Sequence, residues 1–136
     1  MIGEDVAKSL QVKAARYFQE KPANFPEGRP YNCCETVLLT LVEYLDVRSE
    51  LIPKIATSVG AGFSLNGLTC GCVSGVAMAI GIKYGRKTSH VSPQPTWSRV
   101  DRFIAAFRER SLDLPRTHRL RREDSGRYER VCQERS

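Results

Sequence analysis

The sequence predicts a single-domain, all-α bundle of about five helices, and three observations lead to this expectation. At 136 residues the chain has the usual length of one domain. Apolar residues recur at helical spacing between clusters of Gly and Pro, and no alternation typical of a strand extends beyond a few residues. Residues 70–84 are apolar on almost every side, so this helix is expected at the centre of the bundle.

The first three helices are expected over residues 5–21, 33–45 and 49–56, with a loop over residues 22–30. The first helix stops at Pro22, which cannot continue it. Asn32 is a good N-cap for the second helix, and Glu35 three residues later completes a capping-box pattern. Ser49 begins the third helix, whose first turn tolerates Pro53.

A glycine-rich loop, residues 59–67, leads into the central helix and is read equally as a connector or as a shaped part of a site. Within the central helix Gly71, Gly75 and Ala79 recur every four residues and form a ridge of small side chains. Such a ridge lets another helix approach closely. Beyond a loop over residues 86–95, Thr96 is expected to cap a fifth helix that continues through Phe107.

The net charge of +6 does not by itself indicate a nucleic-acid-binding protein. Residues 1–110 hold 14 basic and 10 acidic residues, and residues 111–136 hold 7 and 5, so the excess is spread along the chain. Binding to nucleic acid is therefore not expected. The longest apolar run, residues 76–82, is far shorter than the ~20 residues of a membrane span, and no signal-peptide pattern is present. A cytoplasmic location without membrane association is expected.

Four of the five cysteines gather at two predicted helix starts. Cys33 and Cys34 directly follow Asn32, and Cys70 and Cys72 lie where the glycine-rich loop becomes the central helix. The unpaired N–H groups of a helix start favour a thiolate over a thiol. If the two helices pack side by side with their starts together, the four sulfur atoms converge. In the cytosol such clusters more often do chemistry than staple a fold, and an odd cysteine count argues against a closed disulfide framework.

Three chemistries fit the four cysteines. The first is a dithiol–disulfide couple, with Cys70 as a nucleophile of low pKa, Cys33 as the resolving partner, and Cys34 and Cys72 as accessory thiols. The others are an iron–sulfur cluster, or a zinc or other soft metal ion held by all four thiolates. Pairing across the two clusters is expected rather than within either, because a helix holds Cys70 and Cys72 on different faces.

Two glycines are expected to bind a cofactor beside these cysteines. A glycine inside a helix costs roughly 1 kcal/mol relative to alanine. Gly71 and Gly75 therefore indicate that some group comes close to this part of the backbone.

These segments resemble the C_GCAxxG_C_C family, small helical domains described as redox-active and defined by four cysteines and a CGAxxG motif. Residues 70–75, Cys-Gly-Cys-Val-Ser-Gly, match that motif with Cys72 in place of alanine, and residues 31–38 resemble the segment around the family's first cysteine, here Cys33. The resemblance is expected to cover about residues 5–110. It implies a redox or metal-related role without a defined enzymatic activity. A related domain in split-Soret cytochromes is consistent with an iron–sulfur cluster.

The division expected is a helical cysteine domain over residues 1–110 and a divergent, arginine-rich tail over residues 111–136. The family has two further cysteines, but the tail contains only Cys132. A reading-frame shift near Arg110 is one explanation, since codons for residues 112–121 can be chosen that encode a cysteine-containing segment in another frame. The coding DNA would test this hypothesis, under which Cys132 is incidental.

Other functions remain open from the sequence. The chain could be a non-catalytic binding module whose basic tail contacts nucleic acid or an acidic partner, or a structural protein whose cysteines only pack. The expected partner of a redox function is an unidentified redox protein. The ridge of small residues would also suit contact between helices of a homodimer.

Overall fold

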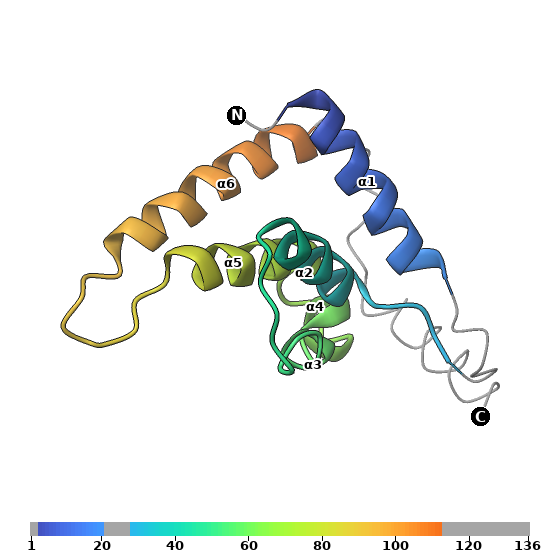
Figure 1. Ribbon diagram of the computed structural model, residues 1–136, viewed down its shortest axis with the longest axis horizontal. Helices are drawn as coiled ribbons and strands as arrows, with labels where there is room; N and C mark the ends of the chain where they lie inside the picture. Colours follow the sequence, from blue (N-terminus) through green and yellow to red (C-terminus); the bar gives the residue numbers. More distant parts are fainter. Residues whose placement is uncertain (1–2, 21–27, 113–136) are drawn as a thin grey trace.

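The computed structural model describes residues 3–20 and 28–112, and within these ranges the chain is helical, with no strand. The helices are α1 (Glu4–Gln19), α2 (Cys33–Tyr44), α3 (Lys54–Thr57), α4 (Gly60–Ser64), α5 (Gly71–Tyr84) and α6 (Gln94–Leu112). Two long outer helices, α1 and α6, slope away from each other on either side of the central helices (Figure 1). The all-α prediction is confirmed.

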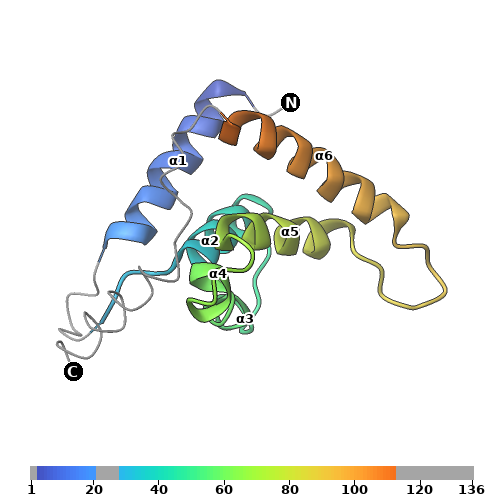
Figure 2. The same cartoon turned by 180° about the vertical axis from the view of Figure 1, so that it is seen from behind.

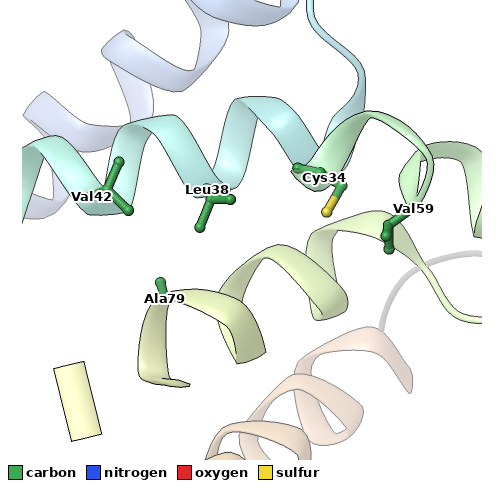
Figure 3. Close-up of a cluster of buried hydrophobic side chains, with 6 residues drawn as sticks. Cys34, Leu38, Val42, Val59 and Ala79 are labelled. Carbon is green, nitrogen blue, oxygen red and sulfur yellow. The ribbon is translucent and has the colours of Figure 1, made fainter. Parts of the chain in front are cut away.

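The centre of the molecule is the contact between α2 and α5. Viewed from behind, α2 and α5 lie at the middle, with α3 and α4 beside them (Figure 2). Cys34, Leu38 and Val42 follow one another along one side of α2, and Ala79 lies on the facing helix α5 (Figure 3). Leu38 and Cys34 are the largest side chains that are completely buried among the described residues.

Helix α2 begins as the sequence predicts. The Asn32 side chain accepts a hydrogen bond from the Glu35 N–H (3.0 Å), and the Glu35 carboxylate accepts one from the Asn32 N–H (2.8 Å). This reciprocal pair is the capping box, and it satisfies two N–H groups that the first turn of a helix leaves without partners. The first residues of α2, which include both of its cysteines, are therefore held in a defined position.

The segment after α2 differs from the predicted third helix. The chain makes turns through residues 50–53, and regular helix is confined to α3, which begins after Pro53. Of its residues only Ala56 is buried, and Leu51 and Ile55 remain exposed. The prediction was wrong over residues 49–53, where the chain turns instead: Ile52 packs against the core while its neighbour Leu51 stays exposed.

The glycine-rich segment forms a short left-handed turn. Five successive residues from Ala61 to Leu65 have positive φ, and the Leu65 N–H donates to the Ala61 carbonyl (3.1 Å). A left-handed conformation costs roughly 1–2 kcal/mol for each residue with a Cβ. Gly62, at φ +69°, adopts it without that cost. The segment is thus an ordered element of the fold.

Helix α6 begins at Gln94, three residues before the expected first residue, Trp97. The Gln94 N–H donates to the Ser92 hydroxyl (3.3 Å), while the Thr96 hydroxyl donates to the Tyr84 carbonyl at the end of α5 (2.6 Å). Thr96 is therefore not the N-cap, contrary to the prediction, because its side chain joins α6 to α5. Helix α6 continues to Leu112. The rest of the expected tail, which includes Cys132, lies outside the described residues. Most of the expected loop over residues 22–30 also lies outside them.

Helix α1 follows its prediction within two residues at each end and rests on α2 through polar and aromatic contacts. Lys13 and Tyr17 of α1 both bond to the carboxylate of Glu43 on α2. The Tyr17 ring also meets the Tyr31 ring edge-on, with centroids 5.6 Å apart. No residue of α1 is buried. No helix in the described part of the chain is both long enough and apolar enough to cross a membrane.

Candidate redox site

The two cysteine pairs lie at the adjoining starts of α2 and α5. Cys33 and Cys34 are the first two residues of α2, Cys70 is the N-cap of α5, and Cys72 is the second residue of α5. The predicted placement at helix starts is confirmed. The capping box positions the first pair, and the packing of α5 on α2 positions the second.

The glycine ridge of α5 brings the two helices into close contact. A Cβ added to Gly71 would lie 2.4 Å from the Cys33 sulfur and 3.1 Å from the Cys34 backbone nitrogen. A Cβ on Gly75 would lie 3.0 Å from the Cys34 carbonyl oxygen and 3.1 Å from Val37. The Cys33 sulfur therefore occupies space that any other residue at position 71 would need. The predicted meeting of the two helix starts is confirmed.

Helix α2 itself is the group that approaches Gly71 and Gly75. Gly71, Gly75 and Ala79 are all buried against it, so the predicted ridge is used within the chain. Close packing accounts for both glycines, and their expected role in binding a cofactor stays a prediction. Because α2 covers the ridge, any homodimer would have to form through another surface.

The four thiols differ in their exposure to solvent. All four are free cysteines: Cys34 is buried, Cys33 and Cys72 are half-buried, and Cys70 is exposed. A reagent or partner protein that approaches the site therefore reaches Cys70 first. Cys33, which is half-buried, lies against the backbone at Gly71. This gradient provides one accessible thiol and one sheltered thiol from different helices.

Burial opposes ionisation of two of the thiols. Burial, followed by the charges of Cys33, Glu35 and Cys70, raises the pKa of Cys34 to about 11. Burial, followed by the charges of Cys70 and Cys33 and a hydrogen bond with the Cys70 side chain, raises the pKa of Cys72 to about 12. The sequence predicted lower pKa values at helix starts. For these two residues that direction is wrong, because desolvation outweighs the partial positive charge of the helix start.

Cys70 and Cys72 interact, although the sequence placed them on different faces of a helix. Cys70 has φ −55° and ψ 130°, so it stands outside the helical geometry that begins at Gly71. Its side chain is consequently free of the helical spacing that would separate it from Cys72, and its proximity contributes to the raised pKa of Cys72. The premise that a helix holds these two residues on different faces is therefore wrong, while the expected pairing across the two clusters stays a prediction. Cys33 and Cys34 of α2 also act on Cys72, and Cys70 acts on Cys34, in raising their pKa values.

The four sulfur atoms do not form a ready-made metal site. Across residues 3–20 and 28–112, no group of three or more His, Cys, Asp or Glu side chains is arranged to hold a metal ion. Without a change in the positions of their side chains these residues do not fit a bound ion or cluster, and no step of the chemistry below depends on one.

A second set of residues, which sequence reasoning did not identify, ties α3 to the start of α2. The Thr57 hydroxyl donates to the Glu35 carboxylate (2.6 Å), and the Asn32 side-chain amide donates to the Thr57 carbonyl (3.1 Å). The Gly60 backbone lies against the Asn32 side chain, since an added Cβ would be 2.2 Å from its Cγ. The density of glycine in this segment was the only sequence signal, and it did not indicate which residues meet.

Comparison with known proteins identifies the class to which this site belongs. The family model described as "Putative redox-active protein (C_GCAxxG_C_C)" matches residues 31–134. The chain therefore belongs to the C_GCAxxG_C_C family. The match includes both cysteine pairs and also Cys132, so it begins later and ends later than the expected range of about residues 5–110. No curated protein and no solved structure matches the chain.

Proposed function

We propose that the protein is a small thiol–disulfide redox protein in which Cys70 and Cys33 form the working couple. The observation that carries this proposal is the contact of the Cys33 sulfur with the backbone at Gly71, next to the exposed Cys70. Membership of a family described as redox-active supports the same chemistry. Cys34 and Cys72 are accessory thiols in this proposal.

The reaction is a two-step exchange with a disulfide of a small molecule or of a partner protein. In the first step the Cys70 thiolate attacks one sulfur of that disulfide, and the departing thiolate takes up a proton. In the second step the Cys33 thiolate attacks the Cys70 sulfur and releases the remaining thiol of the partner. One Cys33–Cys70 bond forms, the partner disulfide becomes two thiols, and two electrons pass from the protein to its partner.

The other two thiols are poor first nucleophiles. Since the pKa values of Cys34 and Cys72 are raised to about 11 and 12, both remain protonated near neutral pH. A thiol reacts as its thiolate, so neither competes with Cys70 for the partner.

We further propose that the protein acts in the cytoplasm with an unidentified redox partner, since reduced thiols require such a compartment. An iron–sulfur cluster or soft metal ion held by Cys33, Cys34, Cys70 and Cys72 stays an alternative, as do a binding module with a basic tail and a protein whose cysteines only pack. The metal and packing alternatives predict different results in the experiment below, and the binding module is tested separately by binding to generic DNA.

The experiment compares the wild type with Cys33→Ser, Cys70→Ser and, as a matched control, Cys34→Ser. Each protein is purified without oxygen, assayed for metal and labile sulfide, and then titrated with oxidised glutathione. Peptide mapping should find a Cys33–Cys70 bond in the wild type and in Cys34→Ser. Cys33→Ser should stop at a glutathione adduct on Cys70.

Two results would contradict the redox couple. An absence of reaction at Cys70 below pH 8 would favour cysteines that only pack. Stoichiometric metal or labile sulfide in the purified protein would favour the metal or cluster alternative. Salt-sensitive binding to generic DNA would support the binding module.

A further inference from the structure

We propose that Thr57 is a positioning residue, which holds Cys70 against Cys33 through a clasp formed with Asn32 and Glu35. The inference rests on the redox couple proposed above and adds the device that sets its geometry. The clasp joins the residue directly before Cys33 to the segment that ends at Cys70.

The clasp is a closed set of hydrogen bonds. The Glu35 carboxylate uses one oxygen to accept from the Asn32 N–H (2.8 Å) and the other to accept from the Thr57 hydroxyl (2.6 Å). The Thr57 carbonyl accepts from the Asn32 side-chain amide (3.1 Å). Thr57 therefore binds both other members, through its hydroxyl and its carbonyl. Helix capping alone requires only Asn32 and Glu35, so the bonds to Thr57 serve the attachment of α3.

The segment from Thr57 to Cys70, here called the strap, is folded onto itself and onto α2. The Ser64 hydroxyl donates to the Ser58 carbonyl (3.0 Å), and the Leu68 N–H donates to the Gly62 carbonyl (3.1 Å). Gly60 rests on Asn32 without room for a Cβ. These bonds restrict the conformations of the strap. A displacement of Thr57 is therefore expected to change the position of Cys70, two residues beyond Leu68.

The two ends of the strap are thus anchored on the same turn of α2. At one end the clasp holds Thr57 to Asn32 and Glu35, and at the other Gly71 lies against the Cys33 sulfur. Holding two reacting groups at a fixed separation raises their effective concentration and favours the intramolecular bond over a mixed disulfide. The clasp is expected to raise the effective concentration of Cys33 and Cys70 relative to each other.

The test uses three threonine variants. Thr57→Val removes the donor and keeps the shape of the side chain, and Thr57→Ser restores the hydroxyl. Thr40→Val is the matched control, because the Thr40 hydroxyl donates to the Thr36 carbonyl (2.8 Å) within α2 and is buried. For each protein the equilibrium constant for the Cys33–Cys70 disulfide is measured in glutathione buffers, and circular dichroism reports the helical content.

Thr57→Val should lower this equilibrium constant by about fivefold, the effect of losing one net hydrogen bond of about 1 kcal/mol. Thr57→Ser should return it to within about twofold of the wild type, and Thr40→Val should leave it unchanged even if the protein is less stable. A wild-type value for Thr57→Val, or an equal decrease for Thr40→Val, would overturn the proposal.

A second measurement separates failure of the clasp from failure of the redox couple. Dibromobimane becomes fluorescent when it links two nearby thiols, so its reaction with Cys33 and Cys70 is followed in a Cys34→Ser, Cys72→Ser, Cys132→Ser background, which leaves only these two of the five cysteines. Wild-type protein that cross-links without ever forming the disulfide would contradict the redox couple alone. In that case slower cross-linking in Thr57→Val still supports the clasp, and equal rates overturn it.

Discussion

The α2–α5 pair buries apolar side chains, whereas the outer helices α1 and α6 leave theirs partly or largely exposed to solvent. Helix α2 buries five residues and α5 buries three, whereas α1 buries none and α6 buries none over residues 94–110. The outer helices are amphipathic, yet Phe18 of α1 and Trp97 of α6 remain more than half exposed. An apolar stripe is therefore not enough for burial, which here requires the small residues that let α5 approach α2.

The same contact that forms the core also forms the candidate site. Cys34 is a core residue and a neighbour of the reactive thiols, and Gly71 both packs the helices and receives the Cys33 sulfur. Stability and thiol geometry are thus expected to change together in the α2–α5 pair and separately elsewhere.

The largest effect is expected for Leu38→Ala. Leu38 is completely buried between α2 and α5, so its truncation should lower the free energy of unfolding by about 3 kcal/mol. Leu51→Ala removes the same atoms from a side chain that is 66% exposed and should cost less than about 0.5 kcal/mol. Urea unfolding followed by circular dichroism measures both. Similar losses in the two variants would mean that the core does not lie at α2–α5.

The next largest effect is expected in the alkylation of Cys34 by iodoacetamide at pH 8. A pKa of about 11, against the usual thiol value of 9.0, lowers the thiolate fraction about a hundredfold. Mass spectrometry should therefore find modification at least that much slower in the folded protein than in the same protein in urea. Native and unfolded rates within about tenfold of each other would contradict the burial of this thiol.

The same shift has a consequence for stability at high pH. The folded protein retains the Cys34 and Cys72 protons above pH 9, where the unfolded chain loses them. The free energy of unfolding therefore keeps its full value below pH 9. It decreases as pH rises above 9 and through the folded-state pKa values of about 11 and 12. In Cys34→Ser the decline of stability over this range should be smaller than in the wild type.

Smaller changes in the free energy of unfolding are expected from Gly75→Ala and Gly81→Ala, both on α5. The two changes should have opposite signs. A Cβ at Gly75 would meet the Cys34 carbonyl at 3.0 Å, whereas a Cβ at Gly81 meets nothing within 4 Å. Gly81→Ala should stabilise the protein by about 0.5–1 kcal/mol through helix propensity. Gly75→Ala should destabilise it by about 1 kcal/mol, since α2 must shift. Stabilisation by both variants would show that α2 and α5 are not in close contact.

The smallest effect is expected on the outer helices. Phe18→Ala should lower the free energy of unfolding by less than about 1 kcal/mol, because 56% of the residue is already exposed. A loss of more than about 2 kcal/mol that depends on protein concentration would show that a second copy of the chain covers α1. Analytical ultracentrifugation of the wild type and the variant distinguishes these outcomes.

Sequence reasoning succeeded where the determining contacts are local. Asn32 and Glu35 are three residues apart, so their capping box could be read from the chain, and so could the ridge of Gly71, Gly75 and Ala79. It failed where the partner is distant. Thr96 bonds to Tyr84, twelve residues away, instead of capping its own helix, and Thr57 meets Glu35 across twenty-two residues.

The sequence by itself determined the helical class, the start of α2, the position of four cysteines at two helix starts and the family to which the chain belongs. Only the tertiary structure decided that the ridge of α5 is covered by α2, that Cys70 is exposed while Cys34 is buried, and that burial raises the pKa of Cys34 and Cys72. Caps and periodicity depend on neighbours within one helical turn. Solvent exposure depends on which distant segments pack together, and desolvation then sets the chemistry of each thiol.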